Sequence, residues 1–454
     1  MKALPDLKAL TPEAKDALIE LLWEELQKLR QGSEKRPKKT SKNSSLPPSQ
    51  GFKPSQKPKF KPNESSVQRP ASVGRVGGGR PLSQQPDHVV QARLQHCADC
   101  GVSLSPDLQR LIQRYDKIEI PPIRPVVTQV ERYGCDCPQC GKVQLAAVPT
   151  SLSPGSPFGQ SIAVLVTTLR YSHAISYARM RELMQEVFGL EISEGAIANL
   201  LSQVNQQLES SVNGILTRLR TARVIGSDET SARVRGINQW EWVFQNEDLC
   251  LHVIRPSRGA DVMQEVLDGH APAVWVSDLF SAQKTHPAED WQVCLSHQLR
   301  DCQYGTDAGD DIFSARMKRL LLWSIGVRHR WDNLAESTRY QYVKRLYRQL
   351  DELLQLSPTQ ADGIRLQNRY RDLKENLFLF LEDTTIPPTN NASEQALRLS
   401  VIFRKVTNGF RSEWGRDLFA KVRSIVNTGK RQGLSAFQSI SRALDPAQSL
   451  FSLS

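Results

Sequence analysis

The feature that most constrains the fold is a series of short apolar segments between residues 222 and 297. Three strand-like segments come first and are joined by short turns: "ARVIGSDETSARV", "NQWEWVFQ" and "LCLHVIR". A helical segment from about Arg258 to Asp268 follows, and then the apolar segments "AVWVSD" and "WQVCLSH". Alternation with a period of two residues is typical of strands, whereas a period of 3.6 residues is typical of helices. The order β-β-β-α-β-α-β therefore predicts a mixed sheet with helices packed on it.

This order is that of a ribonuclease H-like fold, in which the first and fourth strands are neighbours. Asp228 ends the first strand and Asp278 ends the fourth. Neighbouring strands lie about 4.8 Å apart, so the two carboxylates can share one metal ion. Because successive side chains of a strand point to opposite faces, we favour Asp228 over the adjacent Glu229 as the site residue.

Carboxylates in this arrangement suit phosphodiester chemistry. Two divalent ions about 3.5 to 4 Å apart activate the attacking oxygen and stabilise the leaving oxygen. Mg²⁺ fits, because it binds carboxylates while it keeps waters and substrate phosphates as further ligands. A third acidic group has to come from elsewhere in the chain. Glu394, at the start of a basic helix, is the natural candidate, and spacing alone also allows four rivals: Asp310, Asp311, Glu382 and Asp383.

Glu394 also has two purely structural interpretations. It lies three residues after Asn391, where a capping-box carboxylate binds the N–H of the capping residue. It also lies four residues before Arg398, and such a pair on an exposed helix contributes about 0.2–0.5 kcal/mol. A histidine near the fifth strand, His297, is more often a core residue than an acid, a base or a ligand. Residue spacing alone does not decide between the structural and the functional roles of these residues.

The net charge of +11 is concentrated in one segment. Residues 31–80 hold twelve Lys or Arg against two Glu, a net of 12 − 2 = +10, and are rich in Pro, Ser and Gly. Such a composition cannot offset the entropy of ordering by burying apolar surface, so we predict disorder. The segment is either a solvated linker or a polybasic arm that binds phosphates through residues such as Lys35, Lys38 and Lys39.

A second basic concentration lies in the C-terminal part of the chain. Residues 398–431 carry nine Lys or Arg against two acidic residues, a net of 9 − 2 = +7. A basic surface beside an acidic site suits a polyanionic substrate. The predicted DNA contacts in this region are Arg398, Arg404, Lys405 and Arg411.

Four cysteines form two C-x-x-C pairs, each followed by Gly. Cys97 and Cys100 make the first pair, and Cys137 and Cys140 make the second. Four thiolates presented from two such turns predict a tetrahedral structural Zn²⁺ site of the zinc-ribbon type. The alternative is a set of reduced, metal-free thiols. Cys135 is a spare thiol close to the second pair.

Further helical segments lie on either side of the cysteines. Residues 12–30 predict an amphipathic helix, which is either a surface helix or a short coiled-coil contact. Residues 158–204 predict three helices, the last two separated by "GLEIS" with Gly189 after one helix and Ser193 capping the next. That pair is either a helix-turn-helix DNA reader or a packing subdomain. No apolar stretch approaches eighteen residues, so we expect a cytoplasmic protein.

Several strings occur together in a recognisable order: "KNSSLPPSQ", the two cysteine pairs, "SDETSARVRG", "CLSHQLRD", "PPTNNASEQALR" and "FRKVTNGFRS". In this order the chain resembles DDE transposases of the insertion sequence sixty-six family. The resemblance implies that Asp228, Asp278 and Glu394 are the catalytic triad and bind Mg²⁺ or Mn²⁺. It also implies transfer of the 3′ hydroxyl of the element's end to target DNA.

The resemblance extends to partners. It implies that the N-terminal helical and zinc-binding regions recognise terminal inverted repeats, and that small accessory proteins are encoded beside the transposase. Joining of two DNA ends implies a homo-oligomer in a synaptic complex, associated with the nucleoid. Two alternatives remain: a structure-selective nuclease on the same core, and a catalytically inactive DNA-binding regulator.

The expected architecture is a multidomain α+β protein. In chain order we expect an amphipathic helix (1–30), a disordered basic linker (31–90), a zinc-ribbon-like domain (91–150), a helical DNA-binding region (151–220), the first part of the ribonuclease H-like core (221–300), a helical insertion (301–388) and the last part of the core (389–454).

Overall fold

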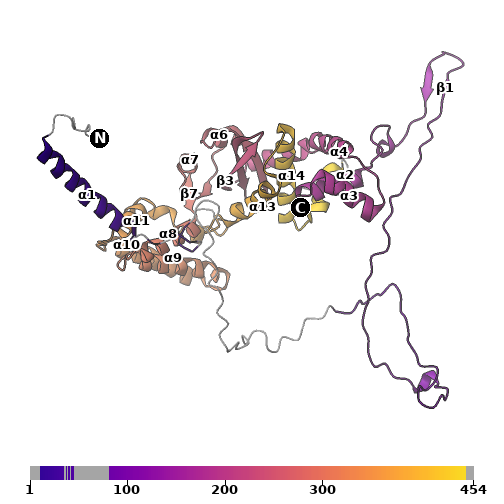
Figure 1. Ribbon diagram of the computed structural model, residues 1–454, viewed down its shortest axis with the longest axis horizontal. Helices are drawn as coiled ribbons and strands as arrows, with labels where there is room; N and C mark the ends of the chain where they lie inside the picture. The colour runs from indigo at the N-terminus through magenta and orange to yellow at the C-terminus, as the bar shows by residue number, and fades with distance from the viewer. Residues whose placement is uncertain (1–10, 35–36, 38, 41, 45–80, 446–454) are drawn as a thin grey trace. The chain divides into compact units, whose positions relative to one another are not determined.

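The computed structural model of the protein describes residues 11–34, 37, 39–40, 42–44 and 81–445 (Figure 1). The chain divides into two compact units. The larger unit comprises Met1–Lys53, Thr128–Leu183 and Glu191–Ser454, and the smaller comprises Pro54–Val127 and Met184–Leu190. Most of the predicted basic linker, including Lys35 and Lys38, lies outside the described residues.

The predicted N-terminal helix is confirmed as α1, Pro12–Glu34. Among its described side chains, Ile19, Leu22 and Trp23 are more than half accessible to solvent. A short stretch after α1 is tied to the larger unit, because Asn43 is buried and its Nδ2 donates to Oδ2 of Asp307 at 2.8 Å. The coiled-coil contact of α1 stays a prediction.

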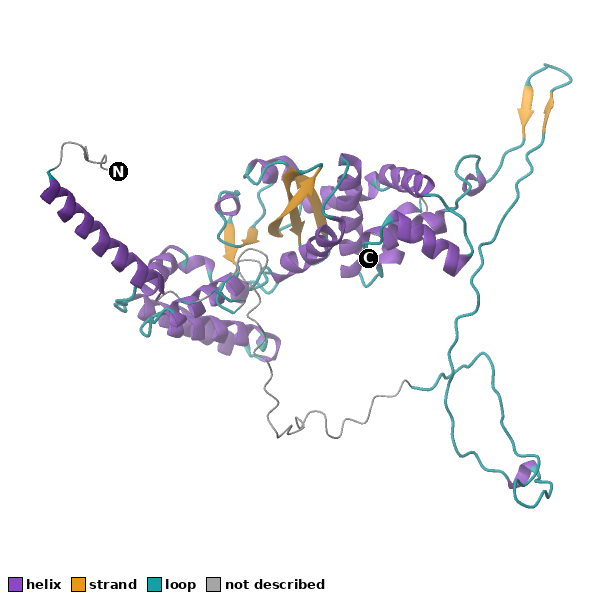
Figure 2. Ribbon diagram, viewed as in Figure 1, coloured by secondary structure: helices purple, strands orange, loops and turns teal. Residues whose placement is uncertain are grey.

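The predicted mixed sheet is present, with helices around it (Figure 2). Its strands are β3 (Val224–Val234), β4 (Ile237–Gln245), β5 (Cys250–Arg255), β6 (Val274–Ser277) and β7 (Asp290–Val293). Their order is β5-β4-β3-β6-β7. The first three strands are antiparallel, whereas β6 runs parallel to β3 and β7 runs parallel to β6. The prediction that the first and fourth strands are neighbours is therefore confirmed.

The apolar segment "WQVCLSH" is divided between a strand and a helix. β7 ends at Val293, Cys294 is the N-cap of the following helix, and His297 lies in that helix, after the fifth strand. Hydropathy alone does not separate the buried end of a strand from the buried first turn of the following helix.

Helices surround and extend the sheet. Before it come α2 (Gln160–Tyr171), α3 (Tyr177–Phe188), α4 (Glu194–Gln207) and α5 (Glu209–Leu219). The short helices α6 (Asp261–Leu267) and α7 (Ser281–Lys284) connect strands. After β7 come α8 (Leu295–Asp307), α9 (Ser314–Arg328), α10 (Glu336–Leu354), α11 (Ala361–Asp372), α12 (Leu379–Glu382), α13 (Asn391–Thr407), α14 (Glu413–Arg431) and α15 (Ala436–Leu444).

The segment between β7 and α13 is helical, as expected for an insertion. Its helices share one apolar core with β6 and β7, in which Phe313, Tyr370, Phe378 and Phe380 are fully buried. Burying aromatic side chains of this size contributes strongly to stability, so the insertion is firmly packed on the end of the sheet that carries β7.

Helix α14 covers the exposed edge of the sheet. Strand β5 is an edge strand, and two of its outward N–H groups are bonded by hydroxyl groups of α14. Cys250 N donates to Thr428 Oγ1 at 3.0 Å, and His252 N donates to Ser424 Oγ at 2.8 Å. Because these two N–H groups are already hydrogen-bonded, they are not available for pairing with another strand.

A buried polar network joins the sheet to α13 and α14. Glu241 of β4 accepts a hydrogen bond from Ser400 of α13 at 2.7 Å, and its Oε1 lies 2.8 Å from Nδ1 of His252. The other ring nitrogen of His252 lies 2.8 Å from Nδ2 of Asn427, whose Oδ1 accepts from Arg423 at 2.9 Å. All five side chains are buried, so the network fixes the position of α13 on the sheet.

Candidate active site

Asp228 and Asp278 lie at equivalent positions along two neighbouring parallel strands. The β3–β6 register aligns Gly226 with Val276, and each aspartate follows two residues later. The prediction that Asp228 ends its strand is wrong, because β3 continues to Val234 in its pairing with β4, whereas Asp278 lies just beyond the end of β6. The two predicted aspartates thus lie side by side where the pairing of β3 with β6 ends.

The surroundings of Asp228 disfavour its ionised form. Burial, and then the negative charges of Glu229, Asp278 and Glu394, raise the pKa of Asp228 well above its ordinary value. The N–H of Glu229, which donates to Asp228 Oδ1 at 2.9 Å, opposes that rise. A carboxyl group beside other carboxyl groups is costly to ionise unless a cation compensates the charge. The arrangement therefore favours a bound cation.

Glu229, the rival of Asp228, has a different environment. Only 3% of its side chain is exposed, and it is paired with Arg258 at 2.8 Å. Its second oxygen accepts from Nε2 of Gln283 at 2.9 Å. Because both oxygens of Glu229 already have partners, Asp228 is the more available ligand of the two.

Glu394 lies in the first turn of α13, but it does not form the capping box. The capping residue is Asn390, which makes no side-chain hydrogen bond to the first turn's N–H groups. The interpretation of Asn391 and Glu394 as a reciprocal cap is therefore wrong. Glu394 points instead toward α8, where its carboxylate lies 3.8 Å from Nδ1 of His297 and 3.7 Å from Nη2 of Arg300. Its ion-pair partner is thus Arg300 and not Arg398.

Two polar atoms at Glu394 are buried without a hydrogen bond. They are Oε1 of Glu394 and Nδ1 of His297, and neither is in contact with solvent. Together with Sγ of Cys294 they form a group of possible metal ligands, with all three atoms within 4.8 Å of one another. Burial raises the pKa of the Cys294 thiol, which also accepts the N–H of Asn390 at 3.1 Å. The unpaired carboxylate oxygen is the atom of this group best suited to a hard cation.

An asparagine pair fixes the start of the helix that carries Glu394, a role that was not predicted from the sequence. Asn390 is buried, and its Nδ2 donates to the carbonyl oxygen of Ser227 at 2.6 Å, one residue before Asp228. Asn391 Oδ1 accepts from Ser296 of α8 at 2.9 Å. The pair thus attaches the start of α13 to both β3 and α8. Its signal is the string "PPTNN", which by itself predicts only a cap.

Three of the four rivals of Glu394 are engaged in structural contacts elsewhere. Asp310 is buried and accepts from the N–H groups of Ile312, Phe313 and Ser314, so it caps α9. Asp383 forms an ion pair with Arg223. Glu382 accepts from Tyr347 at 3.3 Å, and Asp311 is exposed.

The predicted basic contacts occupy several positions. Arg398, Lys405 and Arg411 are exposed, as is Lys39 in the N-terminal part. Arg404 is half-buried, and its Nη1 donates to Ser231 of β3 at 2.9 Å. Arg398 and Lys405 are seven residues apart on α13 and therefore lie on one face of that helix. This face belongs to the helix that carries Glu394.

The two cysteine pairs form similar turns. In the first, Cys97 N donates to Val102 O and Gly101 N donates to Cys97 O, both at 2.9 Å. In the second, Cys137 N donates to Lys142 O at 3.0 Å and Gly141 N donates to Cys137 O at 2.8 Å. The second turn connects the short strands β1 (Gly134–Asp136) and β2 (Val143–Leu145).

The backbone of each turn prepares the first thiol as a ligand. Backbone N–H groups of Cys100 and Asp99 lower the pKa of Cys97, and those of Cys140 and Gln139 lower the pKa of Cys137. A lower pKa favours the thiolate, which is the form that binds zinc. The two pairs belong to different compact units, so the four-cysteine site stays a prediction.

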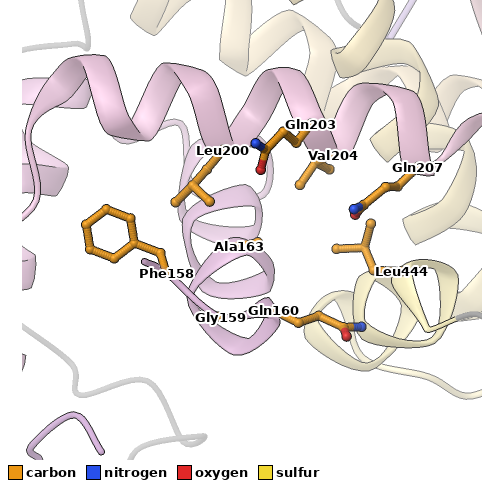
Figure 3. A pocket seen from close by; sticks show the side chains of 9 residues that line it. All are labelled: Phe158, Gly159, Gln160, Ala163, Leu200, Gln203, Val204, Gln207 and Leu444. Atoms are coloured by element: carbon orange, nitrogen blue, oxygen red, sulfur yellow. The ribbon is translucent and has the colours of Figure 1, made fainter. Parts of the chain in front are cut away.

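A separate small pocket lies among the helices before the sheet. It has a volume of about 140 Å³ and lies between the start of α2, the helix α4 and Leu444 (Figure 3). Leu200, Gln203, Val204 and Gln207 line it from α4. None of the predicted site residues lines this pocket.

Comparison with known proteins adds an independent observation. The model of the Transposase IS66 family matches residues 155–417, which include α2 to α13 and all three candidate carboxylates. A search of curated proteins finds no match. Within the described part of the chain, none of the helices has the length and apolar character needed to cross a membrane.

Proposed function

The chain belongs to the Transposase IS66 family, and we propose on this premise that it cleaves the ends of an insertion sequence and joins them to target DNA. The observation that supports this reaction is the alignment of Asp228 and Asp278 on neighbouring parallel strands, with Glu394 near enough for its charge to raise the pKa of Asp228. The strand order is also the one expected for a ribonuclease H-like core.

The proposed ligands of Mg²⁺ or Mn²⁺ are the carboxylates of Asp228, Asp278 and Glu394. Divalent ions at such a site activate the attacking oxygen and stabilise the leaving oxygen. The protein holds Asp228 and Asp278 on neighbouring strands, and the asparagine pair holds the helix of Glu394 against them. Oε1 of Glu394 has no hydrogen-bond partner among the residues that the structure describes, which supports its role as a ligand.

DNA is the partner that a transposase family implies. Arg398, Lys405 and Arg411 are exposed and are the proposed contacts to the DNA backbone next to the site. Such contacts position DNA without reading its sequence. The family implies the terminal repeats as the substrate, and the helical region 151–220 is the proposed reader.

Strand cleavage and joining with purified protein test this function. The DNA carries the ends of the element next to this gene, and Mg²⁺ is either supplied or replaced by EDTA. We expect Mg²⁺-dependent cleavage followed by joined products. Cleavage without joining would identify a nuclease, and DNA binding without cleavage would identify an inactive regulator.

Zinc content tests the role of the cysteine pairs. We expect one Zn²⁺ per chain, and we expect Cys97→Ser and Cys137→Ser to remove it, because structural sites of this kind need four ligands. Elemental analysis of the purified protein measures this content. Cys135→Ser is the matched control and is expected to keep the metal. Full zinc content in both Cys97→Ser and Cys137→Ser would contradict the four-cysteine site.

The salt dependence of DNA binding tests the basic segment. Residues 45–80 carry seven Lys or Arg, at 53, 57, 59, 61, 69, 75 and 80. Replacing all seven by Ser keeps the length of the segment and removes its positive charge. The slope of log affinity against log salt is then expected to fall by about 0.9 for each DNA phosphate that the segment no longer neutralises. An unchanged slope would show that the segment is only a linker.

A further inference from the structure

Arg258, in the loop between β5 and α6, connects three segments around the site. Its Nε and Nη2 both donate to Oε1 of Glu229, at 3.1 and 2.8 Å. Its guanidinium carbon lies 4.5 Å from the ring centre of Trp240 and 4.0 Å from that of Phe280. Arg258 is therefore held between two aromatic rings and a nearly buried carboxylate.

Two of the residues that Arg258 contacts, Glu229 and Phe280, also hold the aspartates through their backbone N–H groups. The N–H of Glu229 donates to Asp228 Oδ1 at 2.9 Å, and the N–H of Phe280 donates to Asp278 Oδ1 at 2.9 Å. In each case the side chain contacts Arg258 and the backbone orients a carboxylate. A displacement of Arg258 would therefore act on both aspartates together.

Gln283 of α7 strengthens this connection. Its Nε2 donates to Glu229 Oε2 at 2.9 Å and lies 3.3 Å from Oγ of Ser227. Ser227 and Glu229 are the two residues that flank Asp228. The backbone of β3 at Asp228 is thus held on both sides from the segment that follows Asp278.

We propose that Arg258 is a positioning residue that sets the spacing of the Asp228 and Asp278 carboxylates, so that both ligate one divalent cation. This inference rests on the proposed function. Residues that orient metal ligands from behind change metal affinity by about 10- to 100-fold when they are replaced.

The contacts require an arginine. Two N–H groups of one planar guanidinium bind Glu229, while its carbon lies within 4.5 Å of two aromatic ring centres. A lysine keeps the positive charge but provides neither the fork nor the planar surface. Arg258→Lys therefore separates the positioning effect from the effect of charge alone.

The test is Mn²⁺ binding to the full-length protein by calorimetry, without DNA. The variants are Arg258→Lys and Arg258→Met. Arg255→Met is the control. Nε and Nη2 of Arg255 bind Oε1 of Glu265 in the same way, at 2.9 and 2.8 Å, but Glu265 is exposed, whereas Glu229 is nearly buried. A parallel measurement is the Mg²⁺ concentration that gives half-maximal cleavage.

We expect Mn²⁺ affinity to fall about 10- to 100-fold in both Arg258 variants and to stay unchanged in Arg255→Met. Saturating Mg²⁺ is expected to restore most of the cleavage by Arg258→Lys. Wild-type Mn²⁺ affinity in the Arg258 variants would overturn the inference, even if their stability fell, since a merely structural role predicts that result.

Two further variants keep the test decisive. If Arg258→Met fails to fold, the double variant Glu229→Gln/Arg258→Met removes the unpaired carboxylate as well and is expected to show the same loss of Mn²⁺ affinity. Asp278→Asn separates the two hypotheses. If Asp278→Asn binds Mn²⁺ as the wild type does, the proposed metal site is wrong. If only the Arg258 variants keep wild-type affinity, the positioning role alone is wrong.

Discussion

Asp228→Asn and Asp278→Asn are each expected to lower Mg²⁺-dependent DNA cleavage about 10³-fold or more while DNA binding is kept. A metal at such a site contributes several kcal/mol of charge stabilisation in the transition state, and about 1.4 kcal/mol corresponds to a factor of ten in rate. Asn keeps the shape of Asp but loses the negative charge. Glu394→Gln is expected to have the same effect. Single-turnover cleavage of end-containing DNA measures the rate.

The controls for this prediction come from the neighbouring acidic residues. Glu289 is exposed and precedes β7, so Glu289→Gln is expected to cleave like the wild type. Asp310 caps α9, so Asp310→Asn is expected to lower stability before activity. A parallel loss of DNA binding in Asp228→Asn would make Asp228 a folding residue. Full activity of Glu394→Gln would mean that the third carboxylate lies elsewhere.

Glu241→Ala is expected to destabilise the protein by about 3–5 kcal/mol, the cost of removing one partner from a buried charged network. Glu241 is 2% exposed and is bonded to His252 and Ser400. Although burial disfavours the charged imidazole, Cys250 and Glu241 raise the pKa of His252 above its ordinary value. Without Glu241, Nδ1 of His252 and the hydroxyl group of Ser400 lose a buried hydrogen-bond partner, and Arg423 loses a nearby negative charge.

Urea unfolding followed by tryptophan fluorescence measures this loss. Glu265→Ala is the matched control, because Glu265 also pairs with a residue of β5 but is 56% exposed. An exposed pair contributes about 0–1 kcal/mol, so the two variants should differ clearly. A change of less than 1 kcal/mol in Glu241→Ala, about that of an exposed pair, would show that the network does not hold α13 to the sheet.

The strands and most helices were predictable because their signals are local. The alternation along "RVIGSDETSARV" and the apolar "AVWVSD" locate β3 and β6 at their observed places. The neighbour relation of these strands follows from their order in the chain, and the register confirms it. Asp228 and Asp278 could therefore be paired before the structure was known. The boundary at Cys294 was missed, because the hydropathy of a buried strand end and of a buried helix start is the same.

Glu394 shows where local signals fail. Its spacing from Asn391 has the form of a capping box, but Glu394 contacts His297 and Arg300 of α8 instead. The choice depends on Asn390, whose amide reaches Ser227, 163 residues earlier in the chain. The periodicity of a sequence gives no information on a hydrogen bond between residues so far apart in the chain. The family resemblance pointed to Glu394, and the structure shows how Asn390 and Asn391 attach the start of its helix to β3 and α8.

The sequence by itself determined the order of strands and helices, the two cysteine turns and the presence of an aspartate on or just after β3 and β6, since each depends on side chains a few positions apart. Only the tertiary structure decided which acidic residues meet and which are engaged elsewhere. Glu229 is taken up by Arg258 and Gln283, and Asp310 by the N–H groups of α9. These assignments arise from contacts between distant segments, where packing and the pairing of buried charge select one partner among many.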